Sequence, residues 1–144
     1  MSDGAVLALD PGSVRVGIAA SDPTRTIATP IAAVARDPAV LWPFVQRQID
    51  ERAITEVVIG LPRNLDGSDG AAAVDARTLA AETRRRTHLP VTLWDERFTT
   101  VQAERELIAA GVRRRTRRER VDAAAAALLL QSWLESSARL ADRG

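Results

Sequence analysis

Short runs of apolar residues alternate with charged and turn-forming stretches along the chain, and five of these runs have the length of β-strands. They cover Ala5–Asp10, Val14–Ala20, Ile27–Val34, Glu56–Gly60 and Val91–Glu96. The first run is unbroken and too short for a helix, which is typical of a buried strand. A tight turn at Pro11-Gly12-Ser13 and a loop at Ser21-Asp22-Pro23 separate the first three runs. We therefore expect these three strands to form a meander.

Four further segments have the capping residues and spacing of helices. Asp37 is a good N-cap and Pro38 suits the first helical position. The helix that they begin presents Leu41, Val45 and Ile49 at helical spacing. The other helices are expected from about Ala71 to Arg86, from a capping box at Thr99 and Gln102 to before Gly111, and from a capping box at Thr116 and Glu119 to roughly Leu140. The order β-β-β-α-β-α-β-α-α predicts an α/β domain whose mixed sheet carries helices on both faces.

The composition narrows the class of protein and of metal site. With 144 residues, 46% of them apolar and 27% charged, the chain has the size and composition of one soluble globular domain. The longest uncharged apolar run, within Val121–Leu134, is too short to span a membrane and there is no signal peptide, so we expect a cytoplasmic protein. There is no Cys and His88 is the only His, which excludes disulfides and thiolate zinc sites. Any bound metal would have oxygen ligands, which favours Mg²⁺ or Mn²⁺.

Two candidate ligands lie at the ends of predicted strands. Asp10 ends the first strand, where a tight turn would hold its carboxylate within reach of a hard cation. A solvated Asp that opens a β-turn is the simpler alternative. Glu96 ends the fifth strand beside Asp95. Because side chains alternate along a strand, Asp95 and Glu96 point to opposite faces and only one of them can join Asp10. The alternation leaves open which one does.

A third acidic residue, Asp122, is predicted on the inner face of the last helix. At helical spacing it shares a face with Ala126, Leu129 and Trp133, and the apolar segment 123–130 requires burial. A buried carboxylate is costly unless a cation pairs with it, so Asp122 is expected to contact either a metal or an arginine. Three carboxylates from three elements, without His or Cys, suit two divalent ions about 4 Å apart that assist phosphoryl displacement.

The basic residues are all arginines, twenty in number, although the net charge is only +1. Six of them occur within eight residues just ahead of Asp122: Arg113, Arg114, Arg115, Arg117, Arg118 and Arg120. A polyphosphate partner would relieve the mutual repulsion in this cluster, so the cluster predicts a nucleic-acid contact, with a solvated surface as the alternative. Arg15 and Arg97 lie close to candidate ligands in the sequence. They are expected either to hold the scissile phosphate or to neutralise the carboxylates.

The segment Gly60–Gly70 is the most loop-like part of the chain. Its glycines can bring backbone N–H groups against a phosphate. The segment follows the C-terminal end of a predicted strand. If that strand runs parallel to the first strand, the loop lies on the same rim as the acidic residues.

Four segments of the chain stand out as motifs: LALDPGSVRVGIA, VIGLPRNLDGS, WDERFTT and VDAAAAALLLQ. In this order they resemble the four motifs of the YqgF/RuvX family, which belongs to the ribonuclease H-like superfamily and is related to the RuvC-type Holliday junction resolvases. The resemblance implies a single RNase H-like nuclease domain over residues 1–144. It also implies a five-stranded mixed sheet, with an antiparallel meander of the first three strands followed by parallel strands. By motif, the metal ligands would be Asp10, Glu96 and Asp122, which favours Glu96 over Asp95.

The same resemblance implies a nuclease with a two-metal site for Mg²⁺ or Mn²⁺ that cleaves near the 5′ end of precursor 16S ribosomal RNA. Resolution of Holliday junctions in DNA is the alternative within the family. Two other hypotheses remain: a non-catalytic nucleic-acid or ribosome-assembly module, and an ATP-binding domain, since a strand followed by Asp-Pro-Gly-Ser also resembles the phosphate loop of actin-like kinases. Such kinases need two domains of this kind. A resolvase works as a symmetric dimer, and the sequence is compatible with a monomer and with a homodimer.

Overall fold

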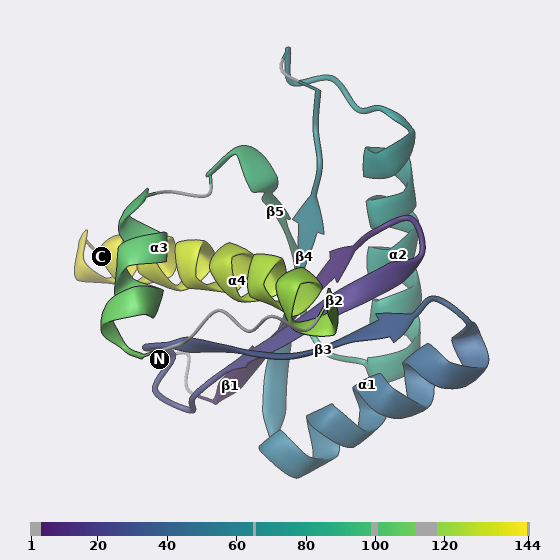
Figure 1. The fold of residues 1–144 in the computed structure, drawn as a ribbon, viewed down its shortest axis with the longest axis horizontal. Helices are drawn as coiled ribbons and strands as arrows, with labels where there is room; N and C mark the ends of the chain where they lie inside the picture. The colour runs from purple at the N-terminus through teal and green to yellow at the C-terminus, as the bar shows by residue number, and fades with distance from the viewer. Residues whose placement is uncertain (1–3, 65, 99–100, 112–117, 144) are drawn as a thin grey trace.

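A central five-stranded sheet organises the part of the chain that the structure describes (Figure 1). The structure is a computed structural model that describes residues 4–64, 66–98, 101–111 and 118–143, without the side chains of residues 101, 118–122 and 139–143. The strands are β1 (Ala5–Pro11), β2 (Arg15–Ser21), β3 (Ala28–Ala35), β4 (Ile54–Leu61) and β5 (Val91–Asp95), in the order β3-β2-β1-β4-β5. The first three strands pair antiparallel, β4 is parallel to β1, and β5 is parallel to β4. This confirms the predicted meander and mixed sheet.

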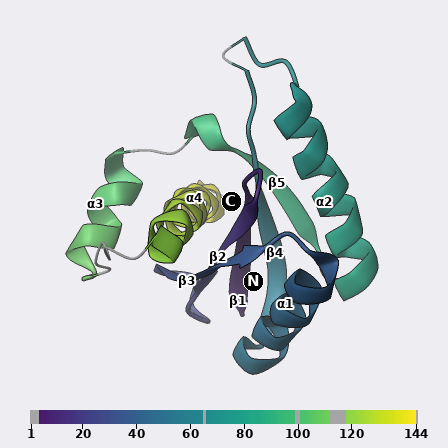
Figure 2. The same cartoon turned by 45° about the vertical axis from the view of Figure 1, so that its right-hand side comes forward.

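Helices cover both faces of this sheet. They are α1 (Pro38–Arg52), α2 (Ala71–Thr87), α3 (Val101–Ala109) and α4 (Arg118–Arg143), with a short 3₁₀ helix, η1 (Glu96–Phe98), after β5. Figure 2 shows α1 and α2 on one face, with α4 and the outer α3 on the other. None of the described helices is long and apolar enough to cross a membrane.

Strand β1 is buried on both faces because its side chains alternate between two cores. Leu7 and Leu9 belong to the core under α1 and α2, whereas Val6 and Ala8 pack with Ala126 and other residues of α4. An unbroken apolar run is the expected pattern for a central strand that is covered on both sides. The strand therefore delivers Asp10, next to its last residue, to a fixed place at the edge of the sheet.

Most predicted boundaries hold within a few residues, and the differences have local causes. Asp37 caps α1 as expected, with its carboxylate accepting a hydrogen bond from Ala39 N at 3.0 Å. β5 ends at Asp95 instead of Glu96, because the Asp95 carboxylate accepts the Arg97 N–H at 2.9 Å and turns the chain into η1. The end of α4 is at Arg143, beyond the expected Leu140. The capping boxes that begin at Thr99 and Thr116 lie outside the described residues.

Candidate functional site

The carboxyl ends of β1, β4 and β5 meet at one edge of the sheet (Figure 1). These three strands are parallel to one another, so side chains at the ends of all three come together. In the register of the sheet, Leu9 pairs with Ile59 and Gly60 pairs with Trp94. Asp10 therefore lies beside Gly60, and Glu96 follows directly after the end of β5.

Asp10 and Glu96 come together over Gly60, which leaves space for both carboxylates because it has no side chain. A Cβ atom built on Gly60 would lie 2.8 Å from Glu96 Oε1, 3.4 Å from Asp10 Oδ1 and 3.1 Å from Leu129 Cδ2 of α4. The structure thus brings Asp10 and Glu96 onto the same side of the sheet edge and directs Asp95 elsewhere. We call Asp10 and Glu96 the carboxylate pair.

The carboxylate pair is electrostatically strained when no cation is present. Burial, a hydrogen bond with Asp10 and the nearby charges of Asp10 and Asp95 raise the pKa of Glu96 to about 8. Burial and the adjacent negative charges both disfavour the ionised form of Glu96, so Glu96 keeps its proton near neutral pH when no cation is bound. No ion pair between described residues reaches Asp10 or Glu96. The pair is therefore suited to binding a cation, which would replace that proton.

The third predicted ligand, Asp122, lies in α4, five residues into the helix, and its side chain is outside the described part of the structure. α4 packs beside Gly60, since a Cβ atom on Gly60 would lie 3.1 Å from Leu129 Cδ2. Among the described side chains there is no group of three or more His, Asp or Glu residues that could hold a metal ion. The joining of Asp122 to the carboxylate pair thus stays a prediction.

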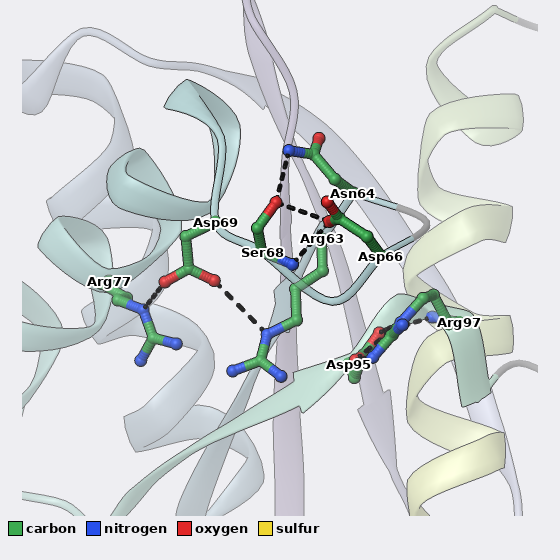
Figure 3. Close-up of polar contacts among 8 residues, drawn as sticks. All are labelled: Arg63, Asn64, Asp66, Ser68, Asp69, Arg77, Asp95 and Arg97. Atoms are coloured by element: carbon green, nitrogen blue, oxygen red, sulfur yellow. Dashed lines mark hydrogen bonds and ion pairs between the residues drawn. The ribbon is translucent and has the colours of Figure 1, made fainter.

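Asp95 is held by Arg97, the middle residue of η1 (Figure 3). The Asp95 side chain is only 8% exposed and accepts Arg97 Nη2 at 2.7 Å and Arg97 Nε at 3.0 Å, besides the Arg97 N–H. The guanidinium lowers the pKa of Asp95, chiefly through these side-chain hydrogen bonds. Arg97 therefore neutralises Asp95. It does not form an ion pair with Asp10 or Glu96, the predicted ligands whose side chains are described.

The loop between β4 and α2 lies on the same rim, as its parallel strand predicted. A Cβ atom on Gly67 would lie 3.8 Å from Arg97 Nη1, so the loop tip is next to η1. The Gly67 N–H is already donated to Asn64 O at 2.9 Å, and Asn64 N donates to Ser68 O at 3.0 Å. These hydrogen bonds lie within the loop and occupy the Gly67 N–H. Contrary to our expectation, this N–H is therefore not available to a phosphate.

Arg63 is a residue of this rim that the sequence reasoning missed. Its Nε lies 3.4 Å from Asp69 Oδ1, and Arg77 binds the other oxygen of Asp69 at 2.8 Å (Figure 3). The charge of Arg63 also contributes to lowering the pKa of Asp95. Its position as the first basic residue after the fourth predicted strand was the available signal.

The predicted phosphate-binding arginines are only partly described. Arg15 begins β2, is half-buried and forms no side-chain hydrogen bond or ion pair with another described residue. Arg113, Arg114, Arg115 and Arg117 lie outside the described residues, and Arg118 begins α4 without a described side chain.

Comparisons with known proteins agree with this architecture. A protein of Mycobacteroides abscessus named "Putative pre-16S rRNA nuclease" is 45% identical over 141 residues, which cover 96% of this chain and 85% of the relative. A protein of the same name from Rhodobacter capsulatus is 41% identical over 138 residues, which cover 95% of this chain and 87% of the relative.

Solved structures of RuvC resemble this one. RuvC of Thermus thermophilus has a TM-score of 0.60 at 12% identity and aligns over 92% of this chain and 95% of its own. The same protein in complex with a Holliday junction substrate has a TM-score of 0.57 at 14% identity, over 93% and 95% of the two chains. At such identities the likeness shows the fold, which is RNase H-like. A family model described as "RuvX: Holliday junction resolvase" matches residues 4–136, and the chain therefore belongs to the RuvX family.

Proposed function

We propose that this protein is a divalent-metal-dependent nuclease, formed by a single RNase H-like domain over residues 1–144, that hydrolyses phosphodiester bonds in the cytoplasm. The observation that carries the proposal is the carboxylate pair, two acids in contact at the carboxyl edge of parallel strands, with no arginine among the described residues to neutralise them. Two unpaired acids in contact lower the stability of the folded protein, and a bound cation would offset this loss.

The donor set fits Mg²⁺ or Mn²⁺. Carboxylate oxygens are the ligands that these hard cations prefer, and the chain has no Cys to attract a softer metal. Asp10, Glu96 and Asp122 would hold the ions, and two such ions supply an activated water and charge stabilisation for the departing oxygen.

The residues of the chain prepare this site in three ways. Gly60 leaves room for the carboxylate pair, and Leu129 of α4 packs beside the same position of Gly60. Glu96 would give up its proton when a cation binds to the pair. Arginines would hold the substrate backbone: Arg15, which lies close to Asp10 in the sequence, and Arg113, Arg114, Arg115, Arg117 and Arg118 ahead of α4. Arg97 would join them through Nη1, since its Nε and Nη2 bind Asp95.

The substrate that we propose is the 5′ end of precursor 16S ribosomal RNA. Relatives at 41–45% identity that cover at least 95% of this chain bear the name of that activity. The test is cleavage of precursor rRNA in Mg²⁺ or Mn²⁺ by the wild type and by Asp10→Asn, with Glu51→Gln as an exposed acidic control on α1. Asp10→Asn is expected to lose about 100-fold or more in rate while it still binds RNA in EDTA. Full activity of Asp10→Asn would contradict the proposal.

Resolution of Holliday junctions is a second candidate, supported by the fold shared with RuvC in complex with a Holliday junction substrate. A synthetic four-way DNA junction assayed beside the precursor rRNA separates the two candidates. Paired symmetric cuts, together with a dimer in sedimentation, favour the resolvase; cleavage of the rRNA alone by a monomer or a homodimer favours the first proposal. Binding without cleavage of either substrate would favour a non-catalytic assembly module.

A further inference from the structure

Phe98 is an aromatic side chain that the fold holds outward at the end of η1. Its exposed fraction is 51%. The chain has five aromatic residues, all within the described part, and Trp42, Phe44, Trp94 and Trp133 are buried or half-buried against the cores. The other large apolar side chains that are exposed among the described residues are aliphatic and lie outside η1. A single exposed apolar residue is ordinary in itself, so the argument depends on how Phe98 is held and where.

The ring of Phe98 is fixed by β5 and α4. It packs edge-to-face against Trp94, with 5.2 Å between centroids and 62° between planes. The Phe98 carbonyl accepts a hydrogen bond from Ser132 Oγ of α4 at 2.6 Å, and Trp94 Nε1 donates to the same Ser132 oxygen at 3.4 Å. Ser132 is buried. The Phe98 backbone is therefore anchored to α4 and its ring packs on Trp94, while the residue stays about half exposed.

The position of Phe98 relates it directly to the carboxylate pair. Glu96 and Phe98 are the first and last residues of η1, so they are separated by about 4 Å of helical rise. Arg97 between them is also exposed. A polynucleotide whose phosphate sits at Glu96 would thus bring a neighbouring base within reach of the Phe98 ring.

We propose that Phe98 is a stacking platform for an unpaired base of the substrate, next to the phosphate at Asp10 and Glu96. Aromatic side chains bind bases through their faces without reading sequence, and only an unpaired base offers its face. The inference rests on the proposed nuclease function and adds that the substrate has single-stranded character at the cut.

A second copy of this chain is a less suitable occupant of the ring. A stable dimer buries about 800 Å² on each partner, whereas one aromatic side chain contributes at most about 250 Å². On η1 the ring's neighbours are the charged residues Arg97 and Glu96. These charges suit a phosphate and its cation better than an apolar interface.

The test is equilibrium binding in Ca²⁺ in place of Mg²⁺ or Mn²⁺, which supplies a cation for the carboxylate pair and is chosen to prevent cleavage. The probes are a single-stranded RNA of about twelve nucleotides with 2-aminopurine at successive positions, and the same sequence in duplex. Phe98→Leu is expected to weaken single-strand binding about tenfold and to abolish the loss of 2-aminopurine fluorescence that stacking causes, with less than about a twofold change for the duplex. Phe98→Trp should retain both signals, and Ile108→Ala, an equally exposed apolar change on α3, should behave as wild type.

Three outcomes are informative. Loss of both signals in Phe98→Leu and their retention in Phe98→Trp, with unchanged thermal melting, supports the platform. Wild-type binding and fluorescence in Phe98→Leu, while the wild type cleaves RNA and Asp10→Asn does not, overturns the platform and leaves the nuclease function standing. A dimer of the wild type that Phe98→Leu dissociates in sedimentation shows that a second copy covers the ring, which also overturns it.

Discussion

At the scale of the residue, the candidate site depends on what Gly60 lacks. A methyl group there would lie 2.8 Å from Glu96 Oε1, so the Glu96 carboxylate would have to move. Real Cβ atoms essentially never approach a neighbour so closely, and misplacing a catalytic group by about 1 Å can cost about 100-fold in rate. Gly60 is therefore part of the site, together with the two acids that meet over it.

We predict that Gly60→Ala keeps the fold and loses nuclease activity by about tenfold or more. Alanine is acceptable to the backbone of β4, since Gly60 has no left-handed φ. The measurement is the cleavage rate on precursor rRNA, with circular dichroism to verify folding. Wild-type activity in this variant would show that the carboxylate pair tolerates displacement.

The raised pKa of Glu96 makes stability depend on pH when no metal is bound. The pKa of Glu96 is about 8 in the folded protein and near 4.5 in the unfolded chain. Between these values the folded state binds the extra proton, so unfolding free energy falls as pH rises, by up to about 1.4 kcal/mol per pH unit. Urea unfolding in EDTA at pH 5 to 8 measures the slope. Glu96→Gln is expected to flatten it, whereas a slope equal to that of Glu51→Gln would contradict the assignment.

At the scale of the element, the end of β5 shows what local sequence can and cannot specify. Alternation correctly predicted that Asp95 and Glu96 separate. It placed Glu96 in the strand, whereas the hydrogen bonds from Arg97 to Asp95 end the strand one residue earlier. The Asp37 cap of α1 was predictable because it involves neighbouring residues only. The role of Arg63 was not, because its partner Asp69 depends on how the loop folds.

We predict that Asp95→Asn lowers activity about tenfold, clearly less than Asp10→Asn. The substitution weakens the charged hydrogen bonds that fix η1, each of which contributes about 1.5–3 kcal/mol in favourable cases, but leaves the carboxylate pair intact. Urea unfolding should therefore show a loss of about 1–2 kcal/mol. Metal titration by calorimetry distinguishes this positioning role from ligation. A loss of metal affinity equal to that of Asp10→Asn would identify Asp95 as a ligand.

At the scale of the whole molecule, the sheet topology brings together residues that the sequence could only suggest as candidates. The unbroken apolar runs and capping residues were sufficient for the order of elements and for the meander. The contact of Asp10 with Glu96, 86 residues apart, requires that β4 lie between β1 and β5 with both pairings parallel. No local pattern encodes that pairing; burial of β1 between two layers of helices selects it.

The arginine cluster ahead of Asp122 predicts how the affinity for nucleic acid depends on salt concentration. Each arginine that contacts a single-stranded phosphate contributes about 0.7 to the slope of log affinity against log salt. Arg114→Gln is expected to reduce the slope by about that amount and to weaken binding to all sequences alike. Arg85→Gln, whose side chain binds Glu82 on α2, should leave the slope unchanged. Fluorescence anisotropy at several salt concentrations tests this, and equal slopes for the two variants would place Arg114 away from the nucleic acid.

The register between β4 and β5 determines how an insertion in β5 would change the site. Because alternate residues of a strand face opposite sides, sliding β5 past β4 by one residue would exchange the places of neighbouring acids. The shorter Asp95 would then approach Asp10, and Glu96 would turn toward the place that Asp95 now occupies beside Arg97. Engineering of this enzyme by lengthening β5 or the connection before it should therefore proceed in steps of two residues, which preserve which acid meets Asp10.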